Sequence, residues 1–234
     1  THFSPKEPWV IGNYGYSAGG WRVKEHPRLL VDVDGDGKAD IVGFDNDGVD
    51  VTLASGQPFS SLLEFGGDSW DTYRNPRYLS DVNGDGLPDI VGFANDGVRV
   101  SYSTGSSFES PMNLLSDFIQ TTQIVNYQTG TTTIAFEKWL FRRMLDVNGD
   151  GLADIIGYRA DGIVVSYSTG KGFLNAEVIL PLDPPNEGGL LPSRVLMTAG
   201  DWYEVAKLEL TDINGDACGD MAWYSDKAVT AYFV

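Results

Sequence analysis

Four aspartate-rich segments of nine residues recur along the 234-residue chain. They read DVDGDGKAD (32–40), DVNGDGLPD (81–89), DVNGDGLAD (146–154) and DINGDACGD (212–220). Aspartate or asparagine occupies positions 1, 3, 5 and 9 of each segment, and the glycines between these positions permit a tight turn. Side-chain oxygens with this spacing can converge on one point. Because Ca²⁺ takes roughly six to eight oxygen ligands, each segment is predicted to be a calcium loop.

The predicted ligands are the side chains at positions 1, 3, 5 and 9 and the main-chain carbonyl at position 7, for up to four structural Ca²⁺ ions. These residues are Asp32, Asp34, Asp36, Lys38 and Asp40; Asp81, Asn83, Asp85, Leu87 and Asp89; Asp146, Asn148, Asp150, Leu152 and Asp154; and Asp212, Asn214, Asp216, Cys218 and Asp220. The loops are not EF-hands, because position 12 lacks the bidentate Glu and the flanking segments have the pattern of strands. The alternative is an Asx-rich turn without metal.

The fourth loop differs from the others at position 6, where Ala217 replaces glycine. If the backbone at this position requires a positive φ, alanine costs free energy there. The fourth loop also holds three carboxylates, whereas the first loop holds four. We therefore expect the fourth loop to bind Ca²⁺ most weakly.

The chain is strongly acidic, with a formal net charge of -17, which disfavours binding to nucleic acid and to anionic membranes. The metal loops hold 13 of its 33 acidic residues, so metal sites account for much of this acidity. The one cysteine, Cys218, excludes an intrachain disulfide. No stretch approaches the roughly 18 apolar residues of a membrane span, and residues 1–5 lack the pattern of a signal peptide. We expect a soluble protein, in either an extracellular or a cytoplasmic location.

Each metal loop lies between two apolar segments that have the pattern of β-strands. Arg28–Val31 precedes the first loop, for example, and IVGF at 41–44 follows it. In the first three units a turn containing Asp-Gly and an alternating segment such as 98–102 come next, which predicts a hairpin. With a further segment at its end, each unit contains about four short antiparallel strands, the pattern of a propeller blade.

The spacing of the loops predicts a closed ring. Their first aspartates are separated by 49, 65 and 66 residues, and a comparable gap of 54 residues would join the last loop to the first through the two ends of the chain. We therefore predict an all-β fold in which residues 1–234 form a single domain, a β-propeller of four blades with four antiparallel strands each. The N-terminal segment would close the ring by completing the last blade. The alternatives are a fragment of a larger propeller and an incomplete ring completed by a second chain.

A second motif precedes the first two metal loops. A tryptophan stands eleven residues before the first aspartate, and a polar residue, proline and arginine follow it. Sugar sites need an aromatic face for the C–H side of the ring and a few polar groups for the hydroxyls. The predicted sugar-binding residues are Trp21, His26, Arg28, Trp70, Tyr73, Asn75 and Arg77. The alternative is that each tryptophan belongs to the core between blades.

Arg28, Arg77 and Arg142 all stand four residues before the first aspartate of a loop. The third unit keeps this arginine although Ala135 stands where the first two units have tryptophan. This pattern indicates a structural role for the arginine, such as pairing with a carboxylate.

The stretch NYGYSAGGWRV at 13–23, HPRLL at 26–30, the first metal loop and IVGF together closely resemble the repeats of the Psathyrella velutina-type mushroom lectins, which are integrin-like propellers of FG-GAP or VCBS repeats. The resemblance covers nearly all of the first unit, most of the second, and mainly the metal-loop half of the others. It implies calcium in the loops and sites for N-acetylglucosamine-type or sialylated glycans between neighbouring blades. Those lectins have more blades than the four counted here.

The sequence therefore favours a calcium-stabilised lectin whose partners are glycans or glycoproteins. The alternative is an integrin-like propeller for protein–protein adhesion, because integrin α-chains share the metal loop. We expect no enzymatic activity, since the chain has two histidines and its one cysteine lies in a metal loop.

Overall fold

A computed structural model describes residues 14–23, 25–60, 62, 64–66, 70, 74–119, 122–123, 136–137, 139–159, 162–181, 208–224 and 229–232. These residues form one short helix, α1 (Tyr16–Gly19), and sixteen strands, all paired antiparallel. No helix in this described part has the length and apolar character needed to cross a membrane.

The strands form four larger sheets, one for each repeat, and one small sheet. The first sheet contains β1 (Arg28–Val31), β2 (Asp40–Phe44) and β3 (Val49–Thr52). The second contains β4 (Arg77–Ser80), β5 (Asp89–Ala94), β6 (Gly97–Ser101) and β7 (Met112–Leu115). The third contains β10 (Trp139–Leu145), β11 (Asp154–Arg159), β12 (Gly162–Ser166) and β13 (Glu177–Pro181). The fourth contains β14 (Leu208–Thr211), β15 (Asp220–Tyr224) and β16 (Val229–Tyr232). The small sheet pairs β8 (Thr122–Gln123) with β9 (Phe136–Glu137).

Each metal loop connects the first two strands of its sheet. In the first sheet the loop begins after Val31, which pairs with Asp40. The predicted hairpin follows: Phe44 pairs with Val49, and the N–H of Asp45 donates a hydrogen bond to the carbonyl of Gly48. The second and third sheets have the same order of strand, loop, strand, turn and strand. This part of the sequence prediction is confirmed.

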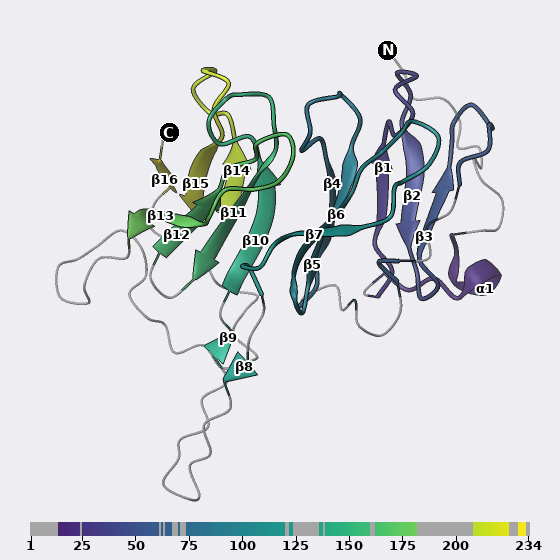
Figure 1. The fold of residues 1–234 in the computed structure, drawn as a ribbon, viewed down its shortest axis with the longest axis horizontal. Helices are drawn as coiled ribbons and strands as arrows, with labels where there is room; N and C mark the ends of the chain where they lie inside the picture. The colour runs from purple at the N-terminus through teal and green to yellow at the C-terminus, as the bar shows by residue number, and fades with distance from the viewer. Residues whose placement is uncertain are drawn as a thin grey trace, which may run out of the picture.

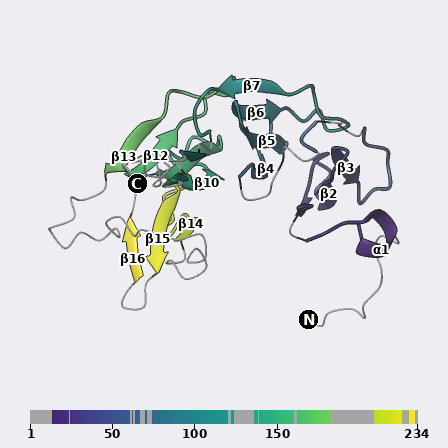
Figure 2. The ribbon, with the colours of Figure 1, turned by 90° about the horizontal axis from the view of Figure 1, so that it is seen from below.

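The four larger sheets stand side by side, in chain order, along an open arc (Figure 1 and Figure 2). The first and the fourth sheet lie at the two ends of the arc, and no strand in the described part pairs one with the other. The predicted closed four-bladed propeller is therefore wrong. The packing between consecutive sheets turns the chain through only part of a circle (Figure 2).

The predicted four strands per unit are also only partly found. The second and third sheets have four strands, whereas the first and fourth have three within the described residues. The N-terminal strand that was expected to complete the last blade falls on residues outside the described part.

Among the described residues, the hydrophobic core consists of three clusters, and each joins two consecutive sheets. The first cluster contains Val42 and Phe44 of the first sheet together with Ile90 of the second. The second cluster joins the second sheet to the third, and the third cluster joins the third sheet to the fourth. Burial of this apolar area therefore holds each sheet against the next and orders the metal loops along one edge of the arc.

Candidate functional site

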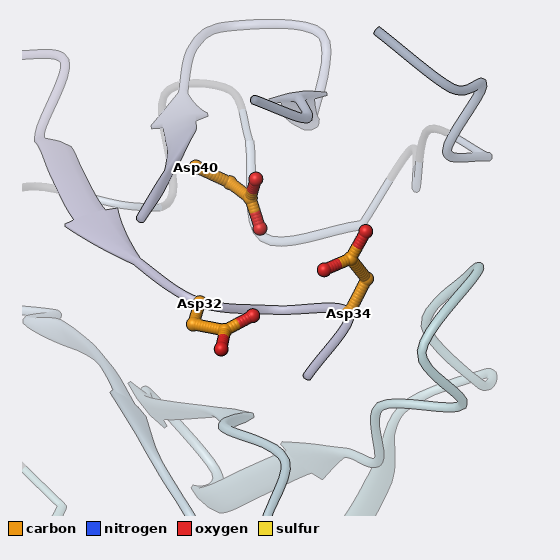
Figure 3. A group of neighbouring side chains, drawn as sticks. All are labelled: Asp32, Asp34 and Asp40. Atoms are coloured by element: carbon orange, nitrogen blue, oxygen red, sulfur yellow. The ribbon is translucent and has the colours of Figure 1, made fainter. Parts of the chain in front are cut away.

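The first metal loop brings three of its predicted ligands together. Carboxylate oxygens of Asp32, Asp34 and Asp40 all lie within 4.8 Å of one another (Figure 3). Two oxygens bound to one Ca²⁺ at about 2.3–2.6 Å are at most about 5 Å apart, so this group fits a single calcium ion. Asp36 has another partner, because its Oδ2 forms an ion pair of 2.7 Å with Lys38 Nζ.

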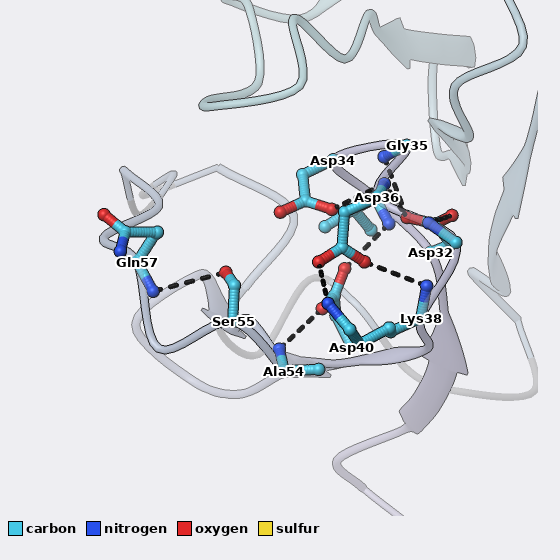
Figure 4. Close-up of polar contacts among 11 residues, drawn as sticks. Asp32, Asp34, Gly35, Asp36, Lys38, Asp40, Ala54, Ser55 and Gln57 are labelled. Carbon is cyan, nitrogen blue, oxygen red and sulfur yellow. Dashed lines mark hydrogen bonds and ion pairs between the residues drawn. The ribbon is translucent and has the colours of Figure 1, made fainter.

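Main-chain N–H groups fix the first aspartate of each loop. Asp32 accepts hydrogen bonds from Gly35 and Gly37, each at 2.8 Å (Figure 4). The corresponding pairs are Asp81 with Gly84 and Gly86, Asp146 with Gly149 and Gly151, and Asp212 with Gly215 and Ala217. The four loops thus share one backbone shape, which a calcium loop and an Asx-rich turn would both have.

In loops two to four the asparagine at position 3 forms a hydrogen bond with the aspartate at position 5. Its side-chain N–H donates to that aspartate over 2.9 Å from Asn83 to Asp85, 3.0 Å from Asn148 to Asp150, and 2.8 Å from Asn214 to Asp216. The aspartate at position 5 also accepts the N–H of position 7, which is Lys38, Leu87, Leu152 or Cys218. The predicted ligands at positions 3, 5 and 7 therefore lie in one connected turn.

The aspartate at position 9 is fully buried in every loop: Asp40, Asp89, Asp154 and Asp220. Asp89 accepts hydrogen bonds from the N–H groups of Val82 at 3.1 Å and Ser103 at 2.9 Å. Burial raises the pKa of Asp89, and likewise that of Asp154, to about 6. A cation next to these carboxylates would favour their charged form.

The fourth loop carries the backbone strain that the sequence predicted. Ala217 has a φ of 73°, close to the 84° of Gly37 at the same position of the first loop. This left-handed conformation costs a residue with a side chain about 1–2 kcal/mol. The positive φ at position 6 is confirmed, and the weaker Ca²⁺ binding of the fourth loop stays a prediction.

Consecutive loops contact each other through positions 7 and 4. Leu87 lies against Gly35, Leu152 against Gly84, and Cys218 against Gly149. A Cβ on these glycines would come 2.9–3.2 Å from the neighbouring side chain, so a larger residue would push the loops apart. Each of the first three loops is therefore in contact with the loop that follows it.

The predicted sugar-binding residues are mostly buried. The exposed fraction is 4% for Trp21 and 8% for Trp70, and their rings lie so close over Gly43 and Gly92 that a Cβ there would be 2.5–2.7 Å from the ring. His26, Asn75 and Arg77 are buried too, Arg28 is half-buried, and Tyr73 lies outside the described residues. Such burial is what the core alternative expects, and a sugar contact with these residues stays a prediction.

His26 and Asn75 each form a hydrogen bond with the side chain of an exposed asparagine. His26 Nδ1 accepts the N–H of Arg22 at 3.0 Å, so its Nε2 carries the proton and donates to Asn46 Oδ1 at 3.4 Å. Asn75 Nδ2 donates to Asn95 Oδ1 at 3.1 Å. Asn46 and Asn95 are exposed in the hairpin turns of the first two sheets. The sequence analysis missed them, although both stand fourteen residues after the first aspartate of a loop.

The three arginines donate hydrogen bonds to main-chain carbonyls of aromatic residues. Arg28 bonds Tyr14 at 2.7 Å, Arg77 bonds Phe65 at 2.7 Å, and Arg142 bonds Phe118 at 2.9 Å. The guanidinium of Arg77 also stacks on Phe44, and that of Arg142 on Phe93, each a residue of the preceding sheet. The predicted structural role is confirmed, although the sequence suggested a carboxylate partner rather than these carbonyls.

The pentapeptide GYSAG at 15–19 matches the G-x-S-x-G pattern of serine hydrolases, which the sequence analysis overlooked. In those enzymes the serine stands between a strand and a helix and is activated by a histidine. Here Ser17 is exposed in the four-residue α1, and both ring nitrogens of His26 have other partners. The described residues therefore give this serine no activating base.

The chain is similar in fold and sequence to a lectin of Agrocybe aegerita that specifically recognises non-reducing terminal N-acetylglucosamine. The identity is 29%, the TM-score is 0.74, and the match covers 96% of this chain and 52% of the lectin, so this chain spans about half of that length. It also matches the Photorhabdus luminescens Tc holotoxin pore, with 16% identity and a TM-score of 0.53 over 87% of this chain and 9% of the toxin, a likeness of fold alone. No protein-family model and no curated protein matches the chain.

Proposed function

We propose that the chain is a carbohydrate-binding protein of the lectin type, which recognises glycans that end in N-acetylglucosamine. The similarity to the Agrocybe aegerita lectin over 96% of the chain carries this proposal. The resemblance of the first two repeats to the Psathyrella velutina-type lectins supports the same class and adds sialylated glycans as a second ligand type.

The sugar contacts are proposed at the turns of the first two sheets. Asn46 and Asn95 are exposed, and a buried donor fixes the carbonyl side of each amide, so the rest of the amide can bond a hydroxyl or an N-acetyl group. Trp21 and His26 would support the site rather than contact the sugar, because their burial leaves little ring surface for a ligand. We assign sugar sites to the first two sheets and none to the third, because the third unit has Ala160 at the position of these asparagines.

Calcium is proposed as a structural ion of the metal loops. Asp32, Asp34 and Asp40 would hold it in the first loop, where their grouped oxygens fit one ion. The ion would supply the positive charge that lets three carboxylates share one turn. The loops themselves position the strands that carry the hairpin turns.

Isothermal titration with chitobiose, and with lactose as a comparison, tests the sugar proposal. We expect binding of chitobiose, and a loss of about tenfold or more in affinity for the Asn46→Ala, Asn95→Ala double variant, since a lost hydrogen bond in a small site costs about 1–3 kcal/mol. Asn175→Ala is the matched control, because Asn175 is exposed in the third unit. Equal affinity for both sugars, or no binding to a folded protein, would contradict the proposal.

A further inference from the structure

Consecutive sheets pack through the same two positions of each repeat. These positions are the residue two places before the first aspartate of the loop and the residue nine places after it. They are Leu79 and Ile90 in the second sheet, Met144 and Ile155 in the third, and Leu210 and Met221 in the fourth. Each pair belongs to or packs against the hydrophobic cluster that joins its sheet to the preceding sheet. We call the face that carries these positions the leading face of a sheet.

Among the described residues, no preceding sheet packs on the leading face of the first sheet. Leu30 and Ile41 occupy its two positions; Leu30 is 68% exposed, Ile41 is half-buried, and neither belongs to a core cluster of the described part. Arg28 on the same strand is half-buried, whereas its counterparts Arg77 and Arg142 are buried against the preceding sheet.

At the other end of the arc, the fourth sheet has an exposed apolar residue on its opposite face. The residue at position 2 of each loop lies on the opposite face, the trailing face, which packs on the next sheet. Val33, Val82 and Val147 occupy this position in the first three loops and are at most 2% exposed. Ile213 occupies it in the fourth loop and is 43% exposed.

We propose that two copies of this chain associate head to tail, so that the leading face of the first sheet in each copy packs on the trailing face of the fourth sheet in the other. The two faces are the halves of one interface that the chain already forms three times internally. They belong to the sheets at the two ends of an open arc (Figure 2).

This arrangement has two equivalent junctions and therefore closes at a dimer. Each junction buries Leu30 of one copy and Ile213 of the other, two apolar side chains that a lone chain exposes to water. The interface is independent of sugar binding, because the proposed sugar contacts lie at the hairpin turns and not on these faces.

Light scattering after gel filtration, over a series of protein concentrations, measures the assembly. We expect twice the 25.5 kDa mass of the chain for the parent protein, and the mass of one chain for Leu30→Glu and for Ile213→Glu. Leu174→Glu is the matched control: Leu174 is 53% exposed, and its counterpart in the second sheet is the exposed Glu109. It should remain dimeric.

Mixing the two monomeric variants tests the head-to-tail geometry. Leu30→Glu keeps an intact trailing face and Ile213→Glu an intact leading face, so a mixture can form one unaltered junction and should recover dimers. A parent protein that stays monomeric, a larger assembly, variants that remain dimeric, or a mixture that stays monomeric would each overturn the proposal. Circular dichroism confirms that the variants are folded.

Discussion

The hydroxyl of Ser103 donates a hydrogen bond of 3.2 Å to the carbonyl of Val33, a residue of the preceding metal loop. The main-chain N–H of Ser103 donates to Asp89 of its own loop. One serine therefore connects two consecutive loops. Ser168 repeats this arrangement, with a bond of 2.7 Å to Val82 and another to Asp154.

Replacing Ser103 by alanine removes the bond between the loops and keeps the main-chain bond to Asp89. We expect a loss of about 1 kcal/mol in the free energy of unfolding, because a buried carbonyl loses its partner. Urea denaturation of Ser103→Ala measures it. Ser110→Ala, at an exposed position, should leave the midpoint unchanged; an equal effect of both variants would rule out a role for the bond.

Calcium should stabilise the fold. An ion that binds only the native state, at about 100 times its dissociation constant, adds roughly 2.7 kcal/mol for each site. Thermal unfolding with calcium and with excess chelator checks this, and the melting temperature should be clearly lower without the ion. Asp34→Ala should reduce the difference between the two conditions, since Asp34 belongs to the group that fits the ion. An unchanged melting curve after verified metal removal would contradict the calcium proposal.

Ala217→Gly should stabilise the protein by roughly 0.5–1 kcal/mol, because glycine relieves the positive φ at this position but gains freedom in the unfolded chain. Chemical denaturation measures the change. Ala39→Gly in the first loop is the control, since Ala39 has no positive φ and glycine there should destabilise or have no effect. Stabilisation by both substitutions would show that the backbone strain is not the cause.

Trp21→Ala should cost about 3–5 kcal/mol of stability, because the ring is buried and fills the space over Gly43. His26→Ala should cost less and should weaken N-acetylglucosamine binding, because it releases Asn46. Comparing thermal stability with sugar affinity for both variants separates the two roles. A stable Trp21→Ala protein that has lost sugar binding would instead make Trp21 a direct ligand.

The repeats, the strands that flank each loop and the strained position of the fourth loop could be predicted from the sequence, because local spacing and turn chemistry determine them. Ring closure could not. The number of residues between loops does not determine the angle between sheets. The 65 residues between the second and third loops, for example, include the separate pair β8 and β9.

The candidate sugar site shows a similar limit. A tryptophan with a neighbouring polar residue has the composition of a sugar site, and so has a core residue with a hydrogen-bonded neighbour. What distinguishes them is the glycine at 43 or 92 under each ring, which lies far along the chain and pairs with the motif only in the fold. Asn46 and Asn95 likewise stand 20 residues from His26 and Asn75, the residues that they contact, so the motif alone does not indicate them.

The overlap of consecutive loops has a kinetic consequence. Leu87, Leu152 and Cys218 each contact the preceding loop, whereas within the described residues nothing lies within 4 Å of the Cβ position at Gly215 in the fourth loop. We expect the contact with the next loop to restrain the backbone around an ion in each of the first three loops, whereas the described residues give the fourth loop no such contact at Gly215. Calcium exchange should therefore be fastest at the fourth loop.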